Sequence, residues 1–215
     1  MSKDQQSESR STTARRFLKA ARKVVIRAGY PALTTKAVAD ECGLRSSLIH
    51  YHFGGKSGMV SALIDQVIRE SSGTSNRREA DSGVEGLDRV EALLQDQQRV
   101  SGDRQDYRLF LELLPSVLRD KGHRSEMAQG YQAYRDHDTE IVRPVAGDVD
   151  DVTLNRLVTL SIALVDGLAI QNALDPEHFD HAGAYTLWRE MFVRALDCDA
   201  ERLRDKTAAM ATETE

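Results

Sequence analysis

Apolar residues recur every three or four positions along most of this chain, which is the spacing of an amphipathic α-helix. Near the N-terminus, Phe17, Ala21, Val24 and Ala28 follow this spacing, and the pattern stops before Gly29, where a first helix is predicted to end. No alternation of apolar and polar residues competes with the helical spacing. The pattern therefore predicts an all-α protein with about nine helices.

Two short helices are predicted next, over residues 35–42 and 46–52, before a longer one over residues 56–72. Thr34 can cap the first of them, and Gly43 can end it in the left-handed conformation that glycine tolerates. Two short helices joined across a glycine and packed on a longer helix are typical of a helix-turn-helix. Its small core is predicted to consist of Val38, Ala39, Leu44, Leu48 and Phe53.

Beyond a polar stretch, five more helical patterns follow, two of them starting after the capping residues Asp150 and Asp180. They cover residues 85–100, 105–119, 123–142, 151–173 and 180–196. We expect a helix-turn-helix domain at residues 12–55 and a second, larger helical domain at residues 56–198. The polar ends are predicted to be a flexible arm, residues 1–11, and a flexible tail, residues 199–215.

Charge is divided unevenly along the chain. The formal net charge at pH 7 is −5, but residues 1–56 hold eleven Lys and Arg against four Asp and Glu, while the remainder holds 18 against 30. A basic head on an acidic body is expected when one end of a protein contacts phosphates. The alternative is a solvated basic helix.

Residues 33–64, LTTKAVADECGLRSSLIHYHFGGKSGMVSALI, resemble the signature of the TetR family of transcriptional regulators. The resemblance implies an N-terminal three-helix DNA-binding domain and a larger C-terminal helical domain for effector binding and dimerisation. It also implies a homodimer on double-stranded DNA with an inverted-repeat operator. The run IHYHFGGK and residues 164–168 are most similar to choline-responsive members, which indicates the branch but not the ligand. The matching positions are Thr34, Val38, Ala39, Cys42, Gly43, Leu44, His52, Phe53 and Lys56.

The second short helix carries the residues predicted to read bases. Arg45 is the strongest of them, because arginine can bond guanine O6 and N7 together. Ser46 and Ser47 are small enough to let the backbone come close, and His50 and Tyr51 are further candidates. Arg45 stands where most family members have a capping Ser, so the cap can move to Ser46 and shift the register by one.

Phosphate contacts are transferred from the family pattern to Thr34, Thr35, Lys36 and Lys56. Lys56 also lies at a helix N-terminus, where free amides and the helix dipole favour an anion. Family members commonly have a Tyr at the position of His50. The resemblance therefore implies that one phosphate contact is made here by a pH-sensitive side chain. For each of these residues the alternative is an ordinary solvent-exposed side chain.

The helix predicted at residues 151–173 is apolar almost all round, so more than one of its faces must be covered. The last helix is amphipathic, and the two are predicted to pair with their copies as a four-helix dimer interface. The alternative is that both belong to the core of one chain. The predicted interface residues are Leu157, Leu164, Leu168, Leu187, Trp188, Met191 and Phe192.

An aromatic and Met set lies between the head and these helices. In proteins resembling the TetR family this region holds the small-molecule effector, whose identity the sequence does not indicate. The alternative is that these residues are ordinary core. The predicted pocket residues are Tyr107, Phe110, Leu114, Met127, Tyr131 and Tyr134.

The sequence lacks the common motifs of enzymes and of metal or cofactor sites. The sequence has no nucleophile elbow, dinucleotide fingerprint or zinc-protease motif, so we predict no enzyme activity and no cofactor. His178 and His181 are explained by a helix start, and Cys42 and Cys198 by two ordinary thiols, so no metal site is predicted. The apolar stretch interrupted by Asp166 falls short of the roughly 20 residues of a membrane helix. We expect a cytoplasmic protein.

The leading hypothesis is a repressor that a small-molecule effector releases from a palindromic operator. Two alternatives stay open. One keeps the fold and makes the protein an activator, and the other is a helical binding module or enzyme whose helix-turn-helix pattern is incidental.

Overall fold

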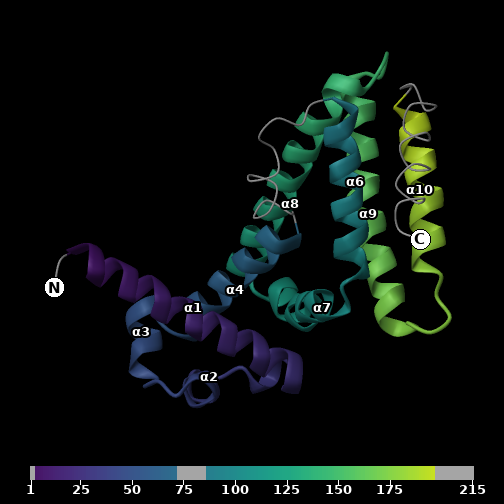
Figure 1. The fold of residues 1–215 in the computed structure, drawn as a ribbon. Helices are drawn as coiled ribbons and strands as arrows, with labels where there is room; N and C mark the ends of the chain where they lie inside the picture. Colours follow the sequence, from purple (N-terminus) through teal and green to yellow (C-terminus); the bar gives the residue numbers. More distant parts are fainter. Residues whose placement is uncertain (1–2, 72–85, 197–215) are drawn as a thin grey trace. The chain divides into compact units, whose positions relative to one another are not determined.

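The computed structural model of the chain describes residues 3–71 and 86–196. Over these residues it contains nine α-helices, two short 3-10 helices and no strand, which confirms the all-α prediction (Figure 1). The predicted tail at residues 199–215 lies outside the described residues. The helices are α1 (Lys3–Ala28), η1 (Tyr30–Ala32), α2 (Thr35–Cys42), α3 (Ser47–Phe53), α4 (Lys56–Ser71), α6 (Leu87–Gly102), α7 (Arg104–Arg119), α8 (Lys121–Val142), η2 (Arg143–Val145), α9 (Asp151–Leu174) and α10 (His181–Ala195).

The chain divides into two compact units. One, called the head here, combines Met1–Ser71 with Arg108–Gly130; the other, called the body, combines Ser72–Tyr107 with Tyr131–Glu215. This division does not follow the predicted boundary at residues 55 and 56, because α4 and the segment from Arg108 to Gly130 pack with the N-terminal helices.

In the head, α2 and α3 pack on α1, whose Phe17, Ala21 and Val24 are buried. The helix-turn-helix core includes the predicted Val38 and Ala39, whereas Leu44, Leu48 and Phe53 are only half-buried. Ile49, which was not predicted, is the one buried residue of α3. Most of the arm predicted at residues 1–11 is helical, because α1 begins at Lys3.

Local capping follows the predictions. The Thr34 hydroxyl accepts a hydrogen bond from the Ala37 N–H at 3.0 Å, and Gly43 ends α2 in the left-handed region at φ 65°. In the body, the Asp150 carboxylate accepts from the Val152 and Thr153 N–H groups at the start of α9. The Asp180 carboxylate accepts from the Gly183 N–H in α10. Each cap satisfies amides that the helix itself leaves without a partner.

A buried polar network joins the helices of the body. The Gln97 amide donates to the Asp138 carboxylate at 3.0 Å and its oxygen accepts from the Ser161 hydroxyl at 2.9 Å. The Tyr185 hydroxyl donates to the Leu94 carbonyl at 2.6 Å. Since buried polar groups are costly without partners, these bonds fix how α6, α8, α9 and α10 are aligned.

The central body helix, α9, is 24 residues long, so it exceeds the apolar stretch that the sequence analysis judged too short for a membrane. It is the one helix among the described residues that is long and apolar enough to cross a membrane. Its strongest packing is against α6 and α10. A core helix of a soluble protein has the same composition, so the length of α9 is weak evidence for a membrane span.

Candidate nucleic-acid interface and effector site

The residues predicted to read bases all lie on one exposed surface of the head. Arg45, Ser46, Ser47, His50 and Tyr51 are exposed, and Tyr51 keeps 59% of its surface accessible. The buried residue of α3, Ile49, anchors the opposite face of the helix. We call the exposed residues Arg45, Ser46, Ser47, His50 and Tyr51 the α3 face.

The start of α3 agrees with the predicted change of cap. Ser46 occupies the cap position, with helical φ and ψ of −61° and −26°, but its side chain makes no capping hydrogen bond. The Arg45 and Ser46 carbonyls instead accept the first turn's amides, from Leu48 at 3.1 Å and Ile49 at 3.0 Å. Both serines are exposed at this turn.

Three of the predicted phosphate contacts, Thr34, Lys36 and Lys56, are exposed, and Thr35 is half-buried. The Thr34 hydroxyl already serves as the cap of α2. Lys56 is the first residue of α4, and its Nζ lies 5.0 Å from the centre of the Tyr30 ring.

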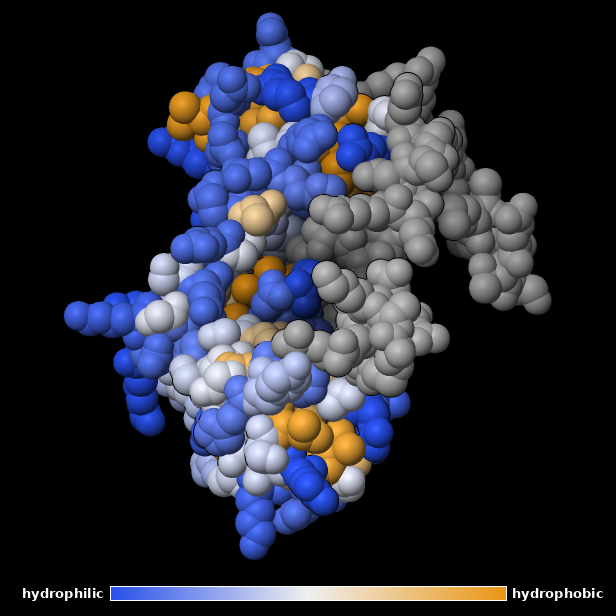
Figure 2. Space-filling view, turned by 90° about the vertical axis from the view of Figure 1, so that its left-hand side faces the viewer, coloured by the Kyte–Doolittle hydropathy of each residue, from blue (hydrophilic) through white to orange (hydrophobic). Residues whose placement is uncertain are grey.

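Three basic residues of α1 bond to α2 within the head. The Arg16 guanidinium donates to the Cys42 carbonyl at 3.0 Å, which satisfies the C-terminal end of α2. Lys23 and Arg27 pair with Glu41 at 3.9 and 3.0 Å. In Figure 2 the N-terminal helices present mostly hydrophilic side chains to the viewer, with small hydrophobic areas between them.

In the body, three of the predicted pocket residues gather around a carboxylate. The Tyr107 hydroxyl donates to Asp166 Oδ1 at 2.5 Å, and the Tyr131 hydroxyl donates to Asp166 Oδ2 at 2.7 Å. Tyr134 packs with Tyr131 against Val158 and neighbouring apolar residues of α9. We call Asp166 and the three tyrosines the tyrosine–carboxylate cluster.

Burial raises the pKa of Asp166, although the two tyrosine hydrogen bonds oppose this shift. Burial and the Asp166 charge together raise the pKa of Tyr107 and of Tyr131, so both phenols stay protonated. In the sequence, Asp166 stands out only as an interruption of an apolar stretch. A lone acid in such a helix is itself a signal, because burying a carboxylate needs compensation.

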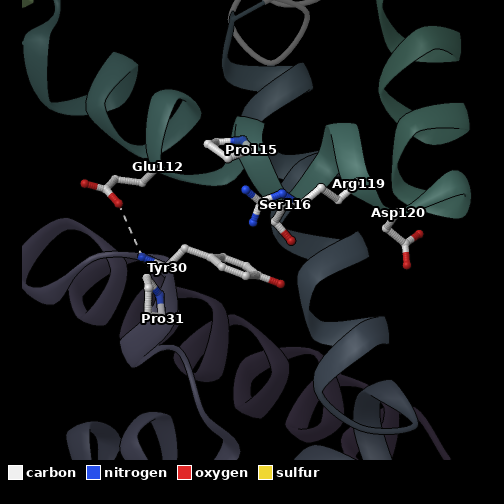
Figure 3. A pocket seen from close by; sticks show the side chains of 7 residues that line it. All are labelled: Tyr30, Pro31, Glu112, Pro115, Ser116, Arg119 and Asp120. Atoms are coloured by element: carbon white, nitrogen blue, oxygen red, sulfur yellow. Dashed lines mark hydrogen bonds between the residues drawn. The ribbon is translucent and has the colours of Figure 1, made fainter.

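The other predicted pocket residues belong to the head unit. Phe110 and Met127 are buried there and Leu114 is half-buried. A pocket of about 470 Å³ also lies in the head, and none of the six predicted residues lines it (Figure 3). Its walls are formed by Tyr30, Pro31, Glu112, Pro115, Ser116, Arg119 and Asp120.

The predicted dimer residues fall into two groups. Leu187 and Met191 of α10 are 62% and 55% exposed, whereas Leu157, Leu164 and Trp188 are half-buried. Leu168 and Phe192 are buried within the chain, so these two are corrected to core residues. Leu168 lies in a helix that is apolar almost all round, and Phe192 shares the apolar side of α10 with the exposed residues, so the pattern alone did not separate core from interface. The large apolar residues exposed on α9 and α10 are Val152, Leu160, Ile170, Leu174, Leu187 and Met191, and Ala163 of α9 is exposed as well.

Two family models match this chain. Residues 17–63 match the bacterial regulatory proteins of the tetR family, and residues 86–210 match the C-terminal domain of BetI-type transcriptional repressors. The second match covers more than half of the chain. The chain belongs to the TetR family.

Two curated relatives support this assignment over part of the chain. The HTH-type transcriptional regulator BetI of Stenotrophomonas maltophilia is 30% identical over 66 residues, 31% of this chain and 34% of that protein. The regulator YvkB of Bacillus subtilis is 37% identical over 54 residues, 25% of this chain and 29% of its own length. The chain thus spans about a third of the curated relatives that it matches.

Solved structures share the fold of this TetR-family chain. A transcriptional regulator from Pseudomonas aeruginosa PAO1 aligns with a TM-score of 0.70 and 21% identity, covering 89% of this chain and 93% of that one. A regulator from Saccharomonospora viridis in complex with choline aligns with a TM-score of 0.67 and 19% identity, covering 86% and 96%. The family is one of transcriptional regulators, not of enzymes.

The raised pKa of Asp166 predicts how the stability of this TetR-family protein depends on pH. Because the folded state holds the Asp166 proton more tightly than the unfolded state, the free energy of unfolding should fall as pH rises from about 4 through the folded pKa. Asp166→Asn should remove this component. Urea unfolding at several pH values, followed by fluorescence of the single tryptophan, Trp188, measures the difference.

The matched control is Asp136→Asn, which changes an exposed acid on α8. It should leave the pH dependence of the wild type unchanged. If Asp166→Asn and wild type lose stability in parallel as pH rises, the pKa of Asp166 is not raised in the folded protein.

Proposed function

We propose that this protein is a dimeric repressor that binds an inverted-repeat operator through the α3 face and Lys56. The observation that carries the proposal is the α3 face itself, which leaves Arg45 and its neighbours exposed in a head whose family binds DNA. Ile49 holds the buried side of α3 in the head, so the exposed side of this short helix can enter a major groove.

The roles of the individual side chains follow from their chemistry. Arg45 offers paired donors for guanine, and Ser46 and Ser47 allow close approach of the backbone. Lys56 and Lys36 neutralise phosphates, which positions the head without reading sequence. His50 and Tyr51 add polar and aromatic contacts from the same exposed side of α3.

A second copy of the chain supplies the twofold symmetry. The exposed residues Leu160, Ala163, Ile170 and Leu174 follow the spacing of one α9 face, and Leu187 and Met191 follow that of one α10 face. Pairing of these helices with their copies covers this apolar surface. Two recognition helices then lie roughly 34 Å apart, the distance between successive major grooves on one side of a duplex.

For the effector, the tyrosine–carboxylate cluster favours an organic cation. Asp166 is half-buried, and a carboxylate that is partly removed from water gains from a positive partner. Tyrosine faces attract quaternary ammonium groups. The Saccharomonospora viridis regulator that shares the fold was solved with choline, which makes choline the first probe for this chain. Binding of the cation would favour the state that fits the operator less well.

Two further points of the proposed function are where the protein works and whether it represses or activates transcription. A regulator that meets chromosomal DNA in a bacterium works in the cytoplasm. Repression is distinguished from activation by a reporter under the operator, compared with and without the gene: repression raises expression when the gene is deleted, activation lowers it.

DNA binding is tested with the duplex that the dimer selects from a random pool. Arg45→Ala should cost roughly 1 to 3 kcal/mol of binding free energy and relax the sequence preference. Lys56→Ala should weaken all duplexes alike and reduce the dependence of log K on log salt by about 1 per head. Fluorescence anisotropy over a range of salt concentrations measures both quantities.

Arg119→Ala, which removes an exposed cation elsewhere in the head, is the control and should bind like wild type. Wild-type behaviour of both Arg45→Ala and Lys56→Ala would show that the DNA lies on another surface.

The dimer is tested by Leu187→Glu. Placing an unpaired charge in the apolar interface should weaken association by at least about 2 kcal/mol and give monomers at micromolar concentration. Leu118→Glu is the matched control, because Leu118 is 57% exposed on the head and lies outside the proposed interface. Sedimentation velocity measures the oligomer, and an unchanged dimer for Leu187→Glu contradicts the proposed interface.

Effector binding is tested by calorimetric titration with choline and with its uncharged isostere 3,3-dimethylbutan-1-ol. Choline should bind and lower operator affinity, and Asp166→Asn should weaken choline binding about tenfold or more, since a charged partner is lost. Asp136→Asn should bind choline like wild type. Equal binding of the isostere, or an unaffected Asp166→Asn variant, would exclude a cation at this cluster.

A further inference from the structure

Lys56 has an aromatic neighbour that the DNA-binding pattern does not include. Its Nζ lies 5.0 Å from the centre of the Tyr30 ring, within the range of a cation–π interaction. Tyr30 is the first residue of η1, the 3-10 helix that joins α1 to α2, and it is half-buried. The ring therefore limits the positions open to an otherwise exposed lysine.

Tyr30 is itself held from α7. Its backbone N–H donates to Glu112 Oε2 at 3.3 Å. The preceding Gly29 has a φ of 77°, and a Cβ built on it would lie only 3.2 Å from the same carboxylate oxygen. The close approach of Glu112 to this turn thus depends on glycine, both for the backbone conformation and for space.

Packing does not hold the Tyr30 ring on its other side. The ring lines the pocket of about 470 Å³ in the head, with Ser116 and Arg119 of α7 on the opposite wall (Figure 3). A side chain beside open space can change rotamer at little steric cost. The hydrogen bond to Glu112 fixes where the Tyr30 backbone lies, and so where its ring can reach Lys56.

We infer that Tyr30 and Glu112 are positioning residues for the phosphate contact of Lys56. Glu112 fixes the η1 turn, the turn sets the Tyr30 ring, and the ring holds the Lys56 ammonium where α4 begins. This inference rests on the proposed function, in which Lys56 meets a phosphate. A lysine that is restrained before binding loses less conformational entropy when it contacts DNA.

The test uses full-length protein and a random-sequence duplex, so it does not depend on the operator. Tyr30→Leu should weaken binding roughly five- to twentyfold for a dimer with two such contacts. Tyr30→Phe, which keeps the ring, should bind like wild type. Ser116→Ala, on the same pocket wall, is the control for a merely local disturbance.

The decisive measurement is a double-mutant cycle. In a Lys56→Ala background, Tyr30→Leu should have no further effect on affinity or on salt dependence, because it acts through the lysine. Circular dichroism and thermal unfolding of each variant identify loss of folding. If Tyr30→Leu weakens binding equally with and without Lys56, the positioning role is wrong.

Glu112 is tested in the same assay. Glu112→Ala should reproduce the loss of Tyr30→Leu, and Glu112→Gln should restore binding because its amide oxygen still accepts the Tyr30 N–H. Glu126→Ala is the matched control: Glu126 lies on α8 in the same unit and accepts from the Ser61 hydroxyl of α4 at 3.0 Å. Equal losses for Glu112→Ala and Glu126→Ala would overturn the assignment of Glu112.

The cycle also separates this inference from the proposed function. If Lys56→Ala leaves affinity and salt dependence unchanged, the DNA contact of Lys56 is wrong and the positioning role fails with it. If Lys56→Ala has its expected effect while Tyr30→Leu and Glu112→Ala bind like wild type, only the positioning role is overturned.

Discussion

The α3 face depends on the burial of one side of α1. A helix of seven residues such as α3 is too short to persist alone in water, so its position comes from packing. Ile49 of α3 and Val38 of α2 are both buried in the head that contains the Phe17 side of α1. These contacts fix α3 from behind, and Arg45 at its start stays exposed to solvent.

In the body, burial destabilises a charged side chain instead of positioning a helix. In the tyrosine–carboxylate cluster, α9 carries Asp166 among apolar residues, where burial raises its pKa and two tyrosine hydroxyls stabilise its charge only in part. By contrast, Asp138 and Gln97 satisfy each other inside a closed network. Polar groups that bond to one another fix how the helices pack. A carboxylate whose burial is only partly compensated gains free energy from a ligand of opposite charge.

Structural features that depend on residues close together in the sequence could be predicted from it. Thr34 and Gly43 act within one helix turn of where they stand, so both ends of α2 followed directly from their chemistry. The burial of Leu168 and Phe192 within the chain could not be predicted, because α9 is apolar almost all round and Phe192 lies on the same apolar side of α10 as the exposed Leu187 and Met191. The contact of Glu112 with Tyr30 joins residues 82 positions apart, and no local pattern indicates it.

The helix α7 contributes to both functional regions through residues that belong to one continuous segment. Tyr107, near its start, donates to Asp166, and Glu112, later in the same helix, accepts from the Tyr30 N–H. A ligand changes an equilibrium only if it binds two states with different affinity. A cation bound at Asp166, as proposed above, would compete for the carboxylate that accepts the Tyr107 hydroxyl. Tyr107 and Glu112 lie in one helix, so the proposed effector site and the turn that carries Tyr30 each bond to α7.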